Sequence, residues 1–209
     1  MTRPDEVNAK AAPDDGKFLP HPEGQFVAKC VDVIDLGEKV EDFIGKPKKL
    51  SPKVVLVFRT GEQNPKNNEV IDVSAEYTVS MFDKANLRKM LEGWRGKQYT
   101  EAECDEGVPL HKLVGNWALL TIDHKISGQN RTYARIIGAV GVPKQMRGNL
   151  PALDEYTRAP YWAERKAAYL KDAQGFKDSM GYSAKGGKDS DFDDLDQRIA
   201  EDEDELPFD

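Results

Sequence analysis

The sequence has little that would place it in a membrane or in an oxidising compartment. No apolar run approaches the roughly 20 residues of a membrane-spanning helix, and the longest stretches, residues 117–122 and 136–142, are strand-sized. Residues 1–17 carry acidic and polar side chains where a signal peptide needs an apolar stretch. Two cysteines, Cys30 and Cys104, are too few for a disulfide framework. We therefore expect a cytoplasmic protein.

Ligands for a metal are also sparse. Neither cysteine belongs to a Cys-x-x-Cys pair, and the three histidines, His21, His111 and His124, are scattered along the chain. Structural zinc sites usually show closely spaced ligand pairs. The sequence therefore predicts no metal, no cofactor and no catalytic residues.

The charge is divided unevenly along the 209 residues. Lys and Arg number 30 against 37 Asp and Glu, for a net charge of −7. Residues 189–209 hold eleven acidic side chains and one arginine, a net charge of −10, so the preceding residues carry +3. A basic body with an acidic tail suits a nucleic-acid partner better than the total charge indicates.

Hydrophobic periodicity predicts five strands with a helix between the third and the fourth. Residues rich in β-branched side chains, with a phase slip at 31–33 that indicates a β-bulge, alternate with Gly- and Asn-rich turns. Leu87, Leu91 and Trp94 form one helical stripe, Gly96 ends that helix, and Asp83 is placed to cap it. The expected strands are residues 25–36, 53–60, 69–82, 115–125 and 132–142, and the expected helices are residues 84–94 and 160–171.

This order is that of the OB-fold, an all-β, five-stranded Greek-key barrel with an inserted helix. A different five-stranded barrel or an α+β sandwich would have the same element order. We expect a disordered arm at residues 1–23, the OB-fold at 24–148, a helical extension at 149–173, and a linker with a disordered acidic tail at 174–209. The extension could cap the barrel, mediate self-association or extend the DNA path.

An OB-fold binds its ligand across the second and third strands, between the first-to-second and fourth-to-fifth strand loops. Single-stranded nucleic acid needs cations for its phosphates and aromatic faces for its bases. Phe58 and Phe82 suit a core better than a surface, because aromatic residues in strands usually face inward, and Trp117 suits either. The candidate DNA-binding residues are Lys46, Lys48, Lys49, Lys53, Phe58, Arg59, Tyr77, Trp117, Lys125, Arg131, Tyr133 and Arg135.

The acidic tail ends in an apolar tip. Leu206, Pro207 and Phe208 follow a run of five acidic residues, and a run that served only solubility would not need them. An apolar anchor beside carboxylates suits a small pocket ringed by Lys or Arg on a partner protein. The candidate partner-binding residues are Asp202, Asp204, Glu205, Leu206, Pro207 and Phe208.

Three segments resemble known families. The tip Asp204-Glu205-Leu206-Pro207-Phe208 is similar to the acidic tip of bacterial single-stranded-DNA-binding proteins, although Asp209 follows where the bacterial tip ends on Phe. Residues 82–100 (FDKANLRKMLEGWRGKQYT) and 113–124 (LVGNWALLTIDH) resemble phage-encoded OB-fold single-stranded-DNA-binding proteins. The resemblance implies a protein that coats single-stranded DNA during phage replication, recombination or repair, in the host cytoplasm, and recruits replication or repair proteins through its tail.

Two other functions remain open at this point. The barrel could instead bind protein, as an interaction adaptor. A Mg-dependent nuclease would need carboxylates that converge on structured elements, whereas the densest acidic residues lie in the tail.

Overall fold

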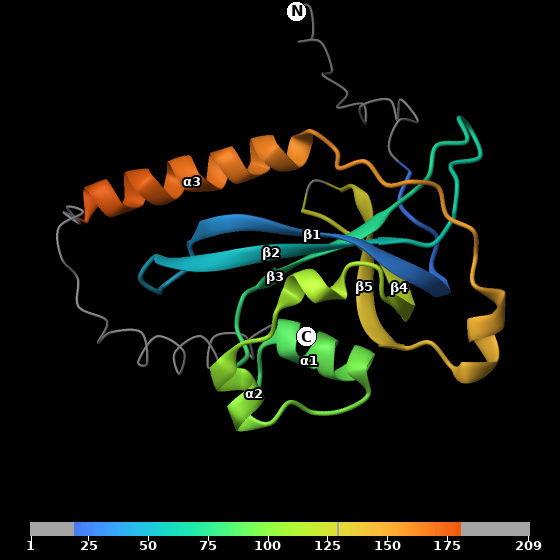
Figure 1. Ribbon diagram of the computed structural model, residues 1–209. Coiled ribbons are helices and arrows are strands. Elements are labelled where there is room, and N and C mark those ends of the chain that lie inside the picture. The colour runs from blue at the N-terminus through green and yellow to red at the C-terminus, as the bar shows by residue number, and fades with distance from the viewer. Residues whose placement is uncertain (1–18, 129, 181–209) are drawn as a thin grey trace, which may run out of the picture.

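The computed structural model describes residues 19–128 and 130–180, which form a five-stranded antiparallel sheet with a helix packed against each face (Figure 1). No helix in this part of the chain is long and apolar enough to cross a membrane. The strands are β1 (Gly24–Glu41), β2 (Lys49–Arg59), β3 (Val73–Thr78), β4 (Trp117–Ile126) and β5 (Thr132–Gly141). The helices are α1 (Asn86–Arg95), α2 (Glu101–Glu106) and α3 (Tyr161–Ser179), with short 3-10 turns η1 (Leu110–Leu113) and η2 (Lys144–Asn149).

The long strand β1 joins the two halves of the sheet. Its residues Gly24 to Lys29 pair with β4, and from Lys29 onward it pairs with β2. A register shift between Cys30 and Asp32 lies next to this change of partner and confirms the predicted bulge, which twists the strand locally. The strand order is β3-β2-β1-β4-β5, so β3 and β5 are the edges of an open sheet.

The first core lies between one face of the sheet and α1. Phe58 of β2 is fully buried there, and Leu87, Leu91 and Trp94 form the buried stripe of α1 that the sequence predicts. The indole Nε1–H of Trp94 donates to the carbonyl oxygen of Trp117 at 2.9 Å. The helix is therefore fixed to the sheet by packing and by one buried hydrogen bond.

The last turn of α1 approaches β5 unusually closely. A Cβ on Gly93 would lie 2.8 Å from the carbonyl oxygen of Ala139, a contact that real Cβ atoms do not make. Gly96 ends the helix with φ of 71°, in the left-handed region that favours glycine. The two glycines thus allow α1 to pack against β5 and then turn away.

The second core lies on the opposite face of the sheet, beneath α3 (Figure 1). β1 contributes Ile34 and Leu36, and β2 contributes Val55 and Val57. Trp162 from the first turn of α3 packs against them and is only 4% exposed. Since each of the two cores takes alternate residues of β2, this strand is buried on both faces.

The mostly β architecture, with its inserted helix and its C-terminal helix, confirms the coarse fold prediction. Two helix boundaries differ from it. Asp83 does not cap α1, because the N-cap is Ala85 and Asp83 instead pairs with Arg88. The C-terminal helix extends to Ser179 rather than to residue 171, and Lys177 in its last turn pairs with Glu38 of β1.

The chain also folds before the predicted boundary at residue 24. His21 is 1% exposed, and its Nε2 lies 2.6 Å from Oγ1 of Thr60. Its backbone oxygen lies 2.7 Å from Nε2 of His124. Burial lowers the pKa of His21 below its ordinary value of 6.5.

Candidate functional site

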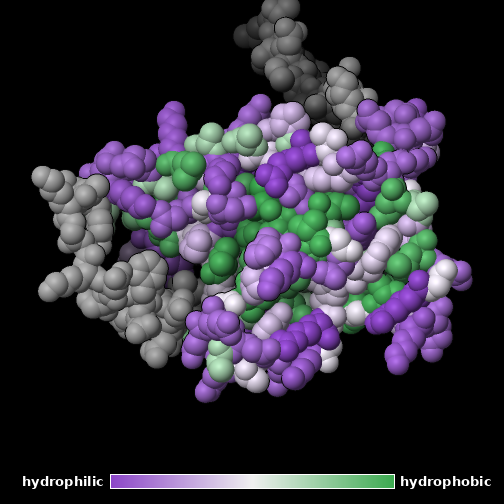
Figure 2. Space-filling view, viewed as in Figure 1, coloured by the Kyte–Doolittle hydropathy of each residue, from purple (hydrophilic) through white to green (hydrophobic). Residues whose placement is uncertain are grey.

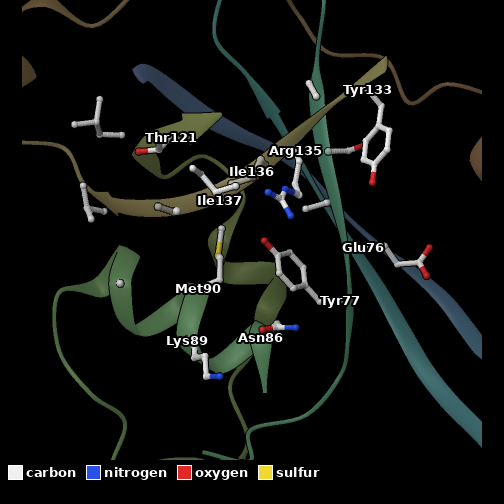
Figure 3. Close-up of a pocket in the computed structure, with 18 residues that line it drawn as sticks. Glu76, Tyr77, Asn86, Lys89, Met90, Thr121, Tyr133, Arg135, Ile136 and Ile137 are labelled. Carbon is white, nitrogen blue, oxygen red and sulfur yellow. The ribbon is translucent and has the colours of Figure 1, made fainter. Parts of the chain in front are cut away.

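An open groove of about 790 Å³ separates β3 from β5 on the side of the sheet where α1 packs. Tyr77 of β3 forms one wall, Tyr133 and Arg135 of β5 form the other, and Met90 of α1 lies at the base (Figure 3). We call this site the β3–β5 groove. It brings together three of the candidate residues that the sequence predicts: Tyr77, Tyr133 and Arg135.

The surface around the groove is apolar at its centre. Figure 2 shows apolar residues gathered in the middle of this face, with hydrophilic residues around them. Ile137 and Val140 of β5 line the groove and are 54% and 49% exposed. Apolar side chains left exposed together at the edge of a groove are typical of a binding surface.

Two tyrosine rings face the groove in different environments. Tyr77 packs against the first core, and burial raises the pKa of its hydroxyl to about 12. Tyr133 stands at the rim and is 37% exposed. A largely buried ring in one wall and an accessible one at the rim would present two faces on which bases can stack.

Arg135 is fixed at the groove by an ion pair across the ladder. Its Nε and one terminal nitrogen bond the carboxylate of Asp123 on β4, at 3.0 and 2.7 Å. This pairing raises the pKa of Arg135 and lowers that of Asp123. Figure 3 shows the guanidinium of Arg135 and the ring of Tyr77 directed toward each other across the groove. The pair orders the side chain and leaves the planar guanidinium face available for stacking.

Exposed cations border the groove. Lys89 of α1 lines it directly, and Lys125 and Arg131 flank the turn between β4 and β5. The structure thus places two further candidate residues, Lys125 and Arg131, on the surface at the end of the strand that forms the groove wall. Phosphates at the β4–β5 turn end of β5 would meet positive charge there.

The opposite face of β2 and β3 is covered by α3 (Figure 1). Its first turns lie over the second core, and cations of α3 and of the segment before it pair with carboxylates on the sheet. The pairs are Arg158–Asp32 at 2.6 Å, Arg165–Glu76 at 2.5 Å, Lys166–Asp35 at 2.7 Å and Lys177–Glu38. A nucleic acid on this face would have to displace the helix and then meet the carboxylates, so a site on the second and third strands would have to use the other face of the sheet, where β3 lines the groove.

Burial removes Lys53 and Phe58 from the candidate surface. Lys53 is 8% exposed, and its Nζ bonds Oε1 of Glu41 at 2.6 Å and Oγ1 of Thr78 at 2.7 Å. Phe58 has no exposed surface, because period two turns it into the first core together with Val54 and Leu56. Both predictions are therefore corrected: these side chains stabilise the sheet.

Arg59 is corrected for the same reason. It is 7% exposed and makes a two-point ion pair with Asp72 at 2.7 and 2.8 Å, which raises the pKa of Arg59. It also donates to the carbonyl oxygens of Asp154 and Glu155, at 3.0 and 2.9 Å. Arg59 thus ties the segment that precedes α3 to the end of β2.

The remaining candidates lie apart from the groove. Trp117 is half-buried at the start of β4. Lys46 and Lys48 are exposed and Lys49 is half-buried at the tip of the β1–β2 hairpin. The turn between β4 and β5 lies beside the first residues of β1, so the two loops expected to flank a ligand are at opposite ends of that strand.

Sequence reasoning missed Met90, Lys89 and Ile137. A usable signal existed for Ile137, because consecutive isoleucines in a strand must point to opposite faces and one of them has to leave the core. Lys89 and Met90 enter the groove only because α1 lies across the gap between the edge strands, which no local pattern encodes.

The tail candidates Asp202, Asp204, Glu205, Leu206, Pro207 and Phe208 lie outside the described residues. In the parts of the chain that are described, no three His, Cys, Asp or Glu side chains are grouped so that they could hold a metal ion. No family model, curated protein or solved structure matches the chain. Its function must therefore be inferred from the chemistry of the groove and its surroundings.

Proposed function

We propose that this protein binds single-stranded DNA in the β3–β5 groove without strong sequence preference, on an OB-fold whose barrel is left open between β3 and β5. The strand order and the helix inserted between β3 and β4 support the OB-fold. The observation that carries the function is that Tyr77 and Tyr133 line the same groove, with exposed cations beside it. Stacking faces bordered by positive charge are what a sequence-tolerant single-strand site requires.

The groove is favoured over the covered face by the sign of the charge. On the covered face, Asp32 and Asp35 are paired with Arg158 and with Lys166 of α3. Around the groove, Lys89, Lys125 and Arg131 are exposed. A polyanion would be attracted by the exposed cations around the groove, whereas on the covered face it would have to compete with carboxylates for their cations.

The acidic tail supplies the second half of the proposal. Its tip, with Leu206 and Phe208 among carboxylates, would dock replication or repair proteins while the body holds the DNA. If the chain is phage-encoded, this would take place during phage replication, recombination or repair in the host cytoplasm.

One observation favours a second candidate function, a protein-binding adaptor. β3 and β5 are both edges, and exposed Ile137 and Val140 lie on one of them. A peptide could add to such an edge as a further strand. Binding of a partner protein at the groove without any affinity for DNA would support this alternative.

The direct test is equilibrium binding of a labelled single strand of about 20 nucleotides, longer than the roughly 4–16 nucleotides that one OB-fold covers. Tyr133→Ala should weaken binding by roughly 5- to 150-fold, the equivalent of one stacked base at about 1–3 kcal/mol. Affinity should also fall as salt rises, because bound phosphates release counterions.

Tyr161→Ala is the matched control, since Tyr161 is 51% exposed but lies on α3, away from the groove. It should leave the affinity nearly unchanged. A preference of the unaltered protein for duplex DNA, an absence of DNA binding, or equal losses in the two variants would contradict the proposal.

A further inference from the structure

The tip of the β1–β2 hairpin holds two apolar side chains out in solvent. Ile44 is 105% exposed, as open as an isolated residue, and Phe43 is 44% exposed. We call residues 42–49 the hairpin tip. The backbone N–H of Lys46 donates to the carbonyl oxygen of Phe43 at 3.0 Å, and the ladder between β1 and β2 runs up to this turn. The two side chains are thus presented at the end of an ordered arm.

Lysines form a positive collar around these apolar side chains. The hairpin tip contains Lys46, Lys48 and Lys49 against one acidic residue, Asp42, so its net charge is +2. Nζ of Lys49 lies 5.8 Å from the centre of the Phe43 ring. A protein surface that receives this tip would need an apolar cavity with a negative rim.

A pocket with those properties lies at the other end of β2. It has a volume of about 260 Å³ and is formed by the β2–β3 connection and the segment that leads into α3. We call it the α3 pocket. Since one water takes up about 30 Å³ of the liquid, the pocket has room for the four side-chain carbons of Ile44 and part of its turn. The apolar lining includes Val70, Ile71, Tyr156, Tyr161 and Trp162.

The rim of the α3 pocket is acidic. Glu69 and Asp72 line it. The two segments that form the pocket, residues 61–72 and 151–162, hold five acidic side chains against two basic ones, a net charge of −3. Arg59, which pairs with Asp72, reduces this to −2. The α3 pocket is therefore a negative region that complements the +2 of the hairpin tip.

The tip and the pocket lie too far apart to meet within one molecule. Lys49 in the tip and Val57 in the pocket are eight residues apart on β2, roughly 26 Å at about 3.3 Å per residue. Figure 1 shows the β1–β2 hairpin and the β2–β3 connection on opposite sides of the sheet. Because β2 is paired with β1 on one side and with β3 on the other, it cannot fold back. A hairpin tip can enter only the α3 pocket of another copy.

We propose that copies of this protein associate head to tail, with Ile44 and Phe43 of one copy in the α3 pocket of the next and the lysines of the tip beside Glu69. The two surfaces differ, so each pair of copies leaves one tip and one pocket unoccupied, and further copies can add. Such a row would suit a protein that coats a strand. The inference nevertheless goes beyond the proposed function and does not depend on DNA binding.

Sedimentation equilibrium of the full chain at increasing concentration, without DNA, tests the association. The average mass of the unaltered protein should rise above the 23.4 kDa of one chain and should not stop at two chains. Ile44→Asp should weaken the association at least about tenfold, because the apolar anchor is lost and a carboxylate meets an acidic rim. Glu69→Lys/Tyr161→Ala should do the same from the other side, and it changes only exposed residues of the pocket.

A mixture of these two variants is the decisive sample. The first keeps an intact pocket and the second keeps an intact tip, so together they can form one contact and no more. The mixture should therefore contain a complex of two chains, about 47 kDa, whereas each variant alone stays at the mass of one chain.

Val114→Asp and Glu106→Lys are the matched controls, because both residues are exposed and follow or end short helices away from the tip and the pocket. They should associate as the unaltered protein does, and all variants should keep the same thermal unfolding. The inference is wrong if the unaltered protein keeps the mass of one chain at every concentration, if either variant associates normally, or if the mixture holds no two-chain complex. Loss of association in Phe208→Ser with the pocket variant still associating would mean that the acidic tail receives the tip, and would also overturn the inference. None of these outcomes alters the proposed function, which the DNA titration decides.

Discussion

Truncating Trp162 tests whether α3 is a permanent cover of the sheet or a lid over a DNA site. The side chain is 4% exposed and packs against Ile34, Leu36, Val55 and Val57. Trp→Ala substitutions in such positions cost about 3–5 kcal/mol, a large part of the roughly 5–15 kcal/mol by which a domain is stable. For a chain of this length each kcal/mol lowers the melting temperature by about 2–4 °C. Trp162→Ala should therefore melt roughly 6–20 °C lower than the unaltered protein and stay folded at room temperature.

The same variant should bind single-stranded DNA with unchanged affinity, because the β3–β5 groove lies on the face that α3 does not touch. Calorimetry gives the melting temperature, and anisotropy titration at 20 °C, a temperature where both proteins are folded, gives the affinity. Tyr161→Ala controls for the loss of a neighbouring aromatic ring, since Tyr161 is 51% exposed and should cost under about 1 kcal/mol. An affinity several-fold tighter in Trp162→Ala would mean that α3 blocks the DNA site, and the groove assignment would be refuted.

Two further predictions concern stability. Gly93→Ala would bring a Cβ to 2.8 Å from the carbonyl oxygen of Ala139. Because the backbone cannot shift freely, this overpacking should lower the free energy of unfolding, measured by urea denaturation, by about 1–3 kcal/mol. An unchanged urea midpoint would show that α1 is not pressed against β5. Burial lowers the pKa of His21, so the imidazole is protonated near pH 6.5 in the unfolded state and only at lower pH in the folded state. The free energy of unfolding should therefore decline as the pH falls from 7.5 to 5.5, and His21→Gln should decline less; parallel profiles would contradict this role for the imidazole.

Much of the fold could be predicted because period-two and helical patterns are local. The bulge in β1, the stripe of α1 and its end at Gly96 all lie within one element each. The candidate residues Tyr77, Tyr133 and Arg135 were predictable because they lie on strands with polar neighbours. Their meeting in one groove depends on which strands become edges, and that is a property of the whole sheet.

The position of α3 could not be predicted from its own sequence, in which the apolar residues are spread around the helix and only Trp162 and Ala173 are buried. The informative signal lies in β2, whose residues Val54 to Phe58 form an unbroken apolar run. Apolar and polar residues alternate in a strand with one solvent-exposed face, whereas a strand buried on both faces is apolar throughout. This run therefore indicates a second covering layer, and with it the burial of Lys53 and Arg59 at the edges of that layer.

The ion pairs that hold α3 also determine when the protein can finish folding. Arg158 and Asp32 are 126 residues apart in the chain, and Lys177 and Glu38 are 139 apart. During synthesis β1 and β2 emerge long before α3 does, so Ile34, Leu36, Val55 and Val57 stay uncovered while the intervening residues are translated. Such contacts form slowly, and exposed aliphatic strands invite aggregation in the meantime. A nascent or truncated chain that lacks α3 should accordingly be the form that chaperones bind.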